Sequence, residues 1–120
     1  MTVFRLTKIV EDDQGVSAFE DAEVPLTDSG PIGSLSELMR AEGAILRVSP
    51  GPFDHDWHPA PARQLLVLLD GEFEIEAGTG ERRRFSGGDV VLAEDTEGRG
   101  HRTVTLSEGP RRSLFVPLCR

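Results

Sequence analysis

The sequence predicts an all-β domain folded as an antiparallel sandwich or barrel. From residue 43 onward, short segments in which apolar and polar residues alternate are separated by turn-forming residues, which is typical of many short strands. Only one segment of the chain carries the signals of a helix, so we expect at most one short helix. Chains of this kind bury their strands in two packed layers or in a closed barrel.

The N-terminal part of the chain is expected to contribute two strands. Residues 2–10 alternate loosely and favour an edge strand. Residues 15–26 carry small and apolar residues at even spacing and predict a second strand, interrupted around Glu20. Residues 27–33 bring Ser, Gly and Pro close together and predict a loop.

The one helix signal lies in residues 34–40. Ser34 can cap the N-terminus of a helical turn, with Glu37 three residues further on. A turn of this length is not stable alone, so we expect it to pack against a sheet.

The rest of the chain predicts one strand after another. Asp70-Gly71 matches the signal of a two-residue hairpin turn. In the strand expected after it, Phe73 and Ile75 alternate with glutamates, and we expect Phe73 and Ile75 to face inward. The expected strands cover residues 44–48, 63–69, 72–77, 81–85, 90–93, 101–106 and 112–118. We therefore expect a single domain over residues 1–120, with N-terminal strands in 1–42 and the barrel core in 43–118.

Charge and cysteine content narrow the classes of partner. A formal net charge of -8 argues against binding to nucleic acid or to an anionic membrane surface. Cys119 is the single cysteine, and no leader or membrane-spanning apolar run is evident, so we expect a cytoplasmic protein. Small antiparallel barrels with edge strands commonly pair, so we also expect a homodimer.

The candidate site centres on residues 54–71, which hold two of the three histidines and the longest apolar run. His58 and Gln64 are separated by an even number of residues and are expected to face the same side, with His101 joining from a separate strand. His55 lies at an odd spacing from His58, so the two should not converge unless a bulge intervenes. The sequence therefore predicts a pocket formed by His58, Gln64 and His101.

These residues resemble the motifs of the cupin superfamily of small β-barrels, G-x5-H-x-H-x3,4-E-x6-G and G-x5-P-x-G-x2-H-x3-N. Counting back from Gly71, Gln64 stands at the Glu of the first motif, His58 at its first His and Ala60 at its second. In the second motif Gly88 and His101 match, Glu94 replaces Pro, and the gap before His is two residues longer. The chain looks like a small single-domain bacterial cupin with a degenerate metal motif. The resemblance implies a cupin-like double-stranded β-helix (jelly roll).

The resemblance also implies a metal site, with His58, Gln64 and His101 as ligands for Fe, Ni, Mn, Co or Zn. Because an amide replaces the carboxylate and Ala60 replaces one His, we expect the metal to be weakly bound or absent. Asp56 shares the parity of His58 and could restore a carboxylate, either as a ligand or as the acceptor that orients an imidazole.

Other polar residues near the site are given less specific interpretations. Trp57 is expected to pack at the barrel rim, and Arg47 could reach the cavity as an anion clamp, although a surface position is the simpler interpretation. Glu94, Asp95 and Glu97 are expected to form a solvated loop.

Two classes of function agree with this pattern. The first is an enzyme of the lyase, isomerase or cyclase type, with His58, His101 and Asp56 as catalytic candidates and with or without a weakly bound divalent metal. Its metal-dependent form includes a dioxygenase, although a redox iron enzyme more often keeps a full ligand set. The second is a non-catalytic protein that binds or senses a small ligand. No Ser-His-Asp pattern, phosphate loop or dinucleotide motif is present.

Overall fold

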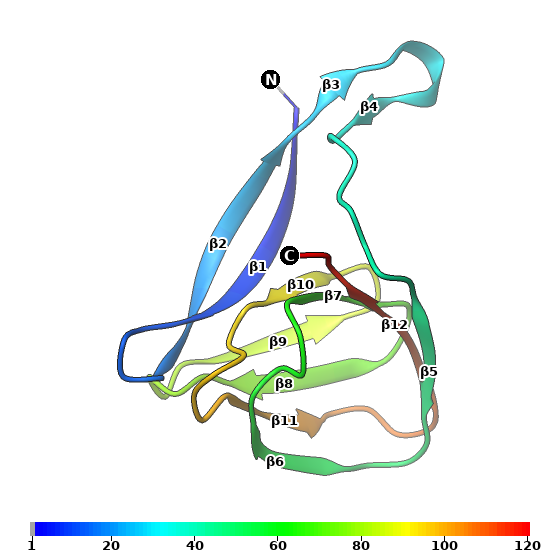
Figure 1. The fold of residues 1–120 in the computed structure, drawn as a ribbon. Helices are drawn as coiled ribbons and strands as arrows, with labels where there is room; N and C mark the ends of the chain where they lie inside the picture. The colour runs from blue at the N-terminus through cyan, green and yellow to red at the C-terminus, as the bar shows by residue number, and fades with distance from the viewer. Residues whose placement is uncertain (1) are drawn as a thin grey trace.

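Two β-sheets pack face to face in the computed structural model, which describes residues 2–120 (Figure 1). The larger sheet has the order β2 (Ser17–Pro25), β1 (Val3–Glu11), β10 (Val90–Ala93), β7 (Gln64–Leu68), β12 (Arg111–Pro117), β5 (Ile45–Ser49). The smaller sheet has the order β6 (Asp54–His58), β11 (His101–Thr105), β8 (Glu72–Glu76), β9 (Arg82–Ser86). Within the described residues every strand pair is antiparallel except β1 with β10. The predicted all-β sandwich is confirmed.

The core lies between the sheets and is built by alternation along the strands. Phe73 and Ile75 of β8 are each 1% exposed, as the sequence pattern predicts, and they pack against Leu68 and Val91 of the larger sheet. β7 is central, because β10 and β12 pair with its two edges. Its inward residues therefore meet the smaller sheet across the core, which places Gln64 at one end of that interior.

The helix predicted in residues 34–40 is wrong. Ser34–Leu35 forms strand β4, which pairs with β3 (Thr27–Asp28), and a single 3-10 turn, η1 (Gly30–Ile32), lies between them. These elements form an arm that projects away from the sandwich (Figure 1), and a groove of about 320 Å³ lies between residues 34–39 and the larger sheet, so the segment lacks the close packing that would stabilise a short helix.

The hairpin predicted at Asp70-Gly71 is also wrong. β7 and β8 belong to different sheets, and Asp70-Gly71 carries the chain from one to the other. Both edges of β7 are already paired, so β8 cannot add beside it. The Asp70 carboxylate instead accepts hydrogen bonds from the backbone N–H of Arg112, at 2.5 Å, and from its Nε, at 2.7 Å.

The N-terminal strands differ from their expected positions in one respect. β1 is not an edge strand, because it pairs along its whole length with β2 and runs parallel to β10 on its other side. β2 forms the edge and continues without interruption through Glu20. None of the helical structure in residues 2–120 is long and apolar enough to cross a membrane.

Candidate ligand cavity

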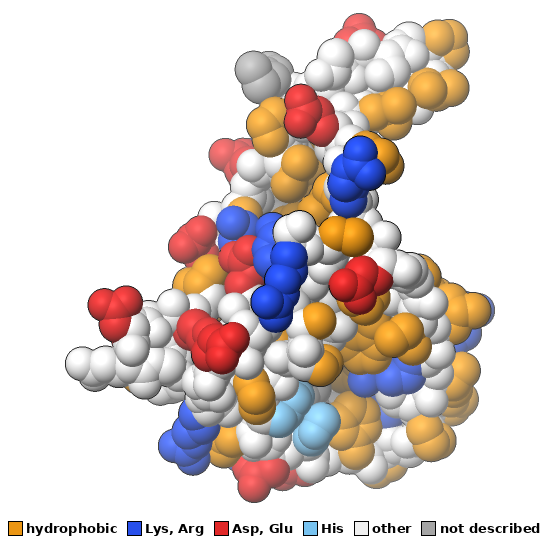
Figure 2. Space-filling view, viewed as in Figure 1, with side chains coloured by type: hydrophobic (Ala, Val, Ile, Leu, Met, Phe, Trp, Pro, Cys, Tyr) orange, Lys and Arg blue, Asp and Glu red, His pale blue; other side chains and the backbone are white. Residues whose placement is uncertain are grey.

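A cavity of about 140 Å³ opens at one end of the interior, between the two sheets. Its polar lining consists of His55, His58, Gln64, His101 and Thr103. Its wall is otherwise mainly apolar, with Leu66, Ile75, Val91 and Phe115 among the residues that form it. Figure 2 shows histidine side chains reaching the surface on this face of the molecule, beside hydrophobic ones. The three residues predicted to form a pocket therefore do line one cavity.

His58 and Gln64 share this cavity for a different geometric reason from the one that their spacing in the sequence suggested. His58 ends β6 in the smaller sheet, whereas Gln64 begins β7 in the larger sheet. The two side chains thus meet across the sandwich and not along one strand. Gln64 is 7% exposed, so its amide is presented to the cavity from the buried side.

His58 and His101 are directly opposite each other in the β6–β11 ladder, and their ring centroids lie 4.6 Å apart. Gly100 permits this approach. It has φ +84°, and a Cβ there would lie 2.1 Å from the carbonyl carbon of His58. Only a residue without a side chain allows the start of β11 to lie this close to β6.

His55 joins the cavity because a β-bulge interrupts the ladder. His101 pairs with His58 and Thr103 pairs with His55, so β6 has one more residue than β11 over this stretch. The extra residue reverses the parity, and the rings of His55 and His58 stack with centroids 3.6 Å apart and planes 10° apart. The bulge that would allow His55 and His58 to converge despite their odd spacing is therefore present, and the three histidines lie together.

Asp95 is buried, which contradicts the solvated loop predicted for it. It is 0% exposed, and its Oδ2 lies 2.6 Å from Nδ1 of His101. Its backbone carbonyl accepts a hydrogen bond from the N–H of Ala60, at 3.0 Å. A signal was available in the sequence, because Asp95 continues the inward parity of Val91 and Ala93 beyond the end of β10.

Asp56 does not bring a carboxylate into the cavity. Its Oδ1 accepts a hydrogen bond from the backbone N–H of Trp57, and the residue is exposed. Its backbone carbonyl lies 2.7 Å from Nδ1 of His58. Trp57 packs under the guanidinium of Arg99, at 4.8 Å, and does not line the cavity.

The hydrogen bonds leave one nitrogen of each of two imidazoles available. Nδ1 of His58 and Nδ1 of His101 are both engaged, so each Nε2 can serve a ligand or a proton. Burial lowers the pKa of His58 below its usual value, an effect partly opposed by the hydrogen bond to the Asp56 carbonyl. Burial thus favours the neutral form of the His58 imidazole.

These groups fit a weakly held metal ion better than a tightly held one. Imidazoles whose Nδ1 is fixed by an oxygen acceptor are the usual form of histidine ligands, and an amide oxygen can add a third donor. None of the residues that line the cavity is an Asp or a Glu, and the nearby carboxylate of Asp95 is engaged with His101. Across residues 2–120, no group of three or more His, Cys, Asp and Glu side chains is arranged to hold a metal ion.

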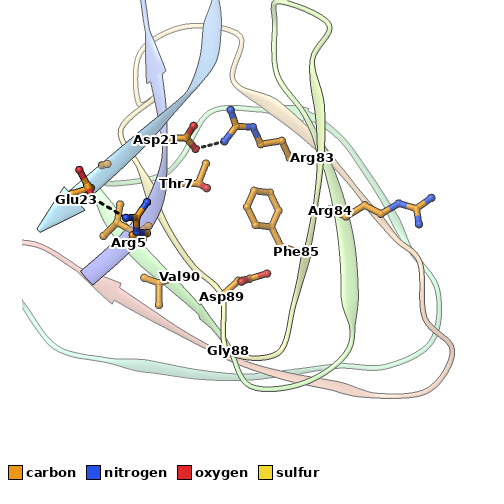
Figure 3. Close-up of a pocket in the computed structure, with 12 residues that line it drawn as sticks. Arg5, Thr7, Asp21, Glu23, Arg83, Arg84, Phe85, Gly88, Asp89 and Val90 are labelled. Carbon is orange, nitrogen blue, oxygen red and sulfur yellow. Dashed lines mark hydrogen bonds and ion pairs between the residues drawn. The ribbon is translucent and has the colours of Figure 1, made fainter. Parts of the chain in front are cut away.

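A larger hollow of about 420 Å³ lies where β9 faces β1 and β2 (Figure 3). Its charged side chains largely neutralise one another. Arg83 contacts Asp21 at 2.6 Å, and Arg5 contacts Glu23 at 3.4 Å. Exposed ion pairs of this kind are typical of a surface where two sheet edges meet in contact with solvent. The three histidines lie instead at the smaller cavity.

Comparisons with known proteins find similarity in structure alone. No family model and no curated protein sequence matches the chain. A Salmonella typhimurium protein described as ethanolamine utilization protein Q is 15% identical, with a TM-score of 0.41 and coverage of 98% of each chain. The cupin domain of Cnp3 from Schizosaccharomyces pombe is 13% identical, with a TM-score of 0.46 and coverage of 97% of this chain and 86% of that chain. The chain itself is an all-β sandwich of two sheets, and His58, Gln64 and His101, whose spacing in the sequence resembles the cupin motifs, lie around one cavity.

Proposed function

We propose that the chain binds a small organic molecule in the cavity between its sheets, with His58, Gln64 and His101 as the polar contacts. The observation that carries this proposal is the convergence of these three groups, from both sheets, in a cavity whose remaining wall is mainly apolar. Apolar cavities with a few convergent polar groups are the usual form of small-molecule sites. A volume of about 140 Å³ holds roughly five water molecules, so the bound part of the ligand is compact.

The histidines favour a proton-transfer enzyme of the lyase, isomerase or cyclase type. His101 is oriented by the buried carboxylate of Asp95, an arrangement that fixes the ring and leaves Nε2 to accept a proton. His58, whose pKa is lowered by burial, faces it with ring centroids 4.6 Å apart. Nε2 of His101 could therefore take a proton from one atom of the ligand and return the same proton at a neighbouring atom, while Nε2 of His58 accepts a hydrogen bond from the ligand.

A divalent metal, when bound by His58, Gln64 and His101, would act as a Lewis acid toward an oxygen of the ligand. His101 would then be positioned by Asp95, and Gln64 would hold its oxygen toward the same point. Without an anionic ligand in this set, we favour non-redox chemistry over a dioxygenase.

A non-catalytic binding protein is the second candidate, and the small size of the cavity favours it. The two proposals share one site and differ in whether the bound ligand is chemically changed. A non-catalytic protein binds its ligand unchanged, and the ligand hydrogens next to a carbonyl do not exchange with deuterium from D2O. Exchange that is lost in His101→Gln indicates an enzyme.

NMR of the imidazole signals tests the shared proposal. A library of compact polar molecules is expected to contain members that shift the ring signals of His58 and His101, and Gln64→Leu is expected to weaken their binding at least tenfold. If a compound changes the NMR signals of the Trp57 ring and leaves those of the two histidines unchanged, it binds outside the cavity and contradicts the proposal.

A further inference from the structure

Two arginines point into the interior of the sandwich without a carboxylate partner. Arg47 on β5 and Arg111 on β12 have the inward parity of Ser113, which pairs with Arg47 across the ladder. Neither takes part in any of the ion pairs found in residues 2–120. This is unusual in a chain of net charge -8, in which most of the arginines meet an acid.

Arg111 is fixed by the backbone. It is 1% exposed, and its guanidinium donates hydrogen bonds to the carbonyls of Ser107, Gly109 and Gly51. Its Nε has no partner among the described residues. The side chain fits because Gly71, with φ +78°, leaves room where a Cβ would lie 2.6 Å from Cδ of Arg111. Arg111 thus supplies a rigid positive charge inside the fold.

Arg47 is the more accessible of the two. Its Nε donates to Oγ of Ser113 at 2.9 Å, which leaves the outer edge of the guanidinium for another acceptor. The group lies 4.5 Å from the ring centroid of Phe115 and 5.8 Å from that of Phe73. Burial, with a further contribution from Arg111, lowers the pKa of Arg47 from its usual value. Its charge is therefore partly desolvated and uncompensated.

Phe115 connects Arg47 with the histidine cavity, because its ring contacts the guanidinium and also lines the cavity. Arg47 therefore lies about one aromatic ring away from the space between His58 and His101. Figure 2 shows basic side chains recessed among hydrophobic ones beside the histidines. Arg47 itself does not line the cavity, so a ligand that contacts both the histidines and the guanidinium must extend past the edge of the Phe115 ring.

We propose that the ligand of the cavity is a small carboxylate, and that Arg47 binds its carboxylate group while His58 and His101 contact the other end. This inference rests on the proposed function and specifies its substrate class. A planar guanidinium with a free edge suits a carboxylate, which it can bind through two parallel hydrogen bonds. The anion supplies the counter-charge that Arg47 and Arg111 lack, and Arg111 strengthens the positive potential around the site.

The test compares 5-hydroxypentanoate with 5-hydroxypentanamide, which has nearly the same shape and no charge, and which is long enough to extend past one aromatic ring. Metal is first removed with a chelating resin, and binding is followed through the imidazole signals of His58 and His101. We expect 5-hydroxypentanoate to bind at least tenfold more tightly than 5-hydroxypentanamide. We expect Arg47→Gln to remove this preference and Arg47→Lys to retain part of it. Arg99→Gln, at the exposed arginine stacked on Trp57, is the matched control and should leave 5-hydroxypentanoate affinity unchanged.

The outcomes separate the two proposals. Equal binding of 5-hydroxypentanoate and 5-hydroxypentanamide by the unmodified protein, which requires no variant to fold, overturns the carboxylate proposal and leaves the cavity as a binding site. Equal effects of Arg47→Gln and Arg99→Gln overturn it as well. If neither probe, nor any member of the polar library, moves the histidine signals, the proposed function itself fails.

Discussion

His101 and Asp95 form a buried hydrogen-bonded pair, with Nδ1 and Oδ2 2.6 Å apart and Asp95 fully buried. The contact links the loop after β10 to the first residue of β11. Because the Asp95 carbonyl also accepts a hydrogen bond from Ala60, one residue positions both His101 of the smaller sheet and the segment that connects β6 with β7. His101 therefore has a structural role in addition to the one proposed for it in the cavity, whereas the His58 ring makes its hydrogen bond to a backbone carbonyl two residues away.

The two histidines are expected to differ in their contribution to stability. His101→Ala leaves a buried carboxylate with neither oxygen bonded, and we expect it to lower the free energy of unfolding by about 3 kcal/mol. His58→Ala, which strands no buried group, should cost about 1 kcal/mol. Urea unfolding measures both. His101→Ala combined with Asp95→Ala should cost less than the sum of the single changes, and strict additivity would contradict the pairing.

Gly100 is expected to be essential for placing His101 opposite His58. In Gly100→Ala the new Cβ would meet the His58–Pro59 backbone, which cannot move without separating β6 from β11. We expect a loss of more than about 2 kcal/mol and a change in both imidazole signals. Gly80→Ala is the control, because Gly80 has φ +93° and open space where the Cβ would lie. Similar losses in the two variants would show that backbone strain alone, and not the close approach, is responsible.

The sequence predicted most of the strands because their alternation is local. The interior positions of Phe73 and Ile75 follow directly from the pattern of β8. The sequence could not predict which edges are already paired, and this is why Asp70-Gly71 was taken for a hairpin. The same limit applies to the site. His55 enters the cavity through a bulge, which depends on the register between β6 and β11 and leaves no local signal in either strand.

Asp95 illustrates a different limit. The surrounding residues are acidic and rich in turn formers, so composition favours a solvated loop. Its inward parity with Val91 and Ala93 was the stronger physical signal, because a buried strand determines the direction of the residues that follow it. A charged residue in such a position requires a buried partner, and His101 provides one.

Metal binding is expected to be weak and to be strengthened by two changes. Ala60 lines the cavity at the place where the cupin motif has a second His, and Gln64 replaces the Glu. Ala60→His with Gln64→Glu would add an imidazole and a negative charge, and we expect at least a hundredfold tighter binding of Ni²⁺ by calorimetry. For the unmodified protein, plasma mass spectrometry after exhaustive EDTA dialysis should find little metal. A stoichiometric amount of metal after dialysis would contradict the prediction of weak binding.

Asp70 is expected to contribute stability at neutral pH that disappears in acid. Its hydrogen bonds to the backbone and side chain of Arg112 hold its pKa below the usual value, because they favour the ionised carboxyl group. In the folded state this pKa is lower than in the unfolded chain, so the contribution is complete above about pH 4 and is lost as the pH falls through the folded-state value. Asp70→Asn should lower Tm by a few degrees at pH 7, and this difference should shrink as the pH falls toward 2. Asp13→Asn, in an exposed turn, serves as the control and should change Tm little at either pH. A difference between Asp70→Asn and the unmodified protein that stays constant from pH 7 to pH 2 would show that the ionised carboxylate is not the stabilising form.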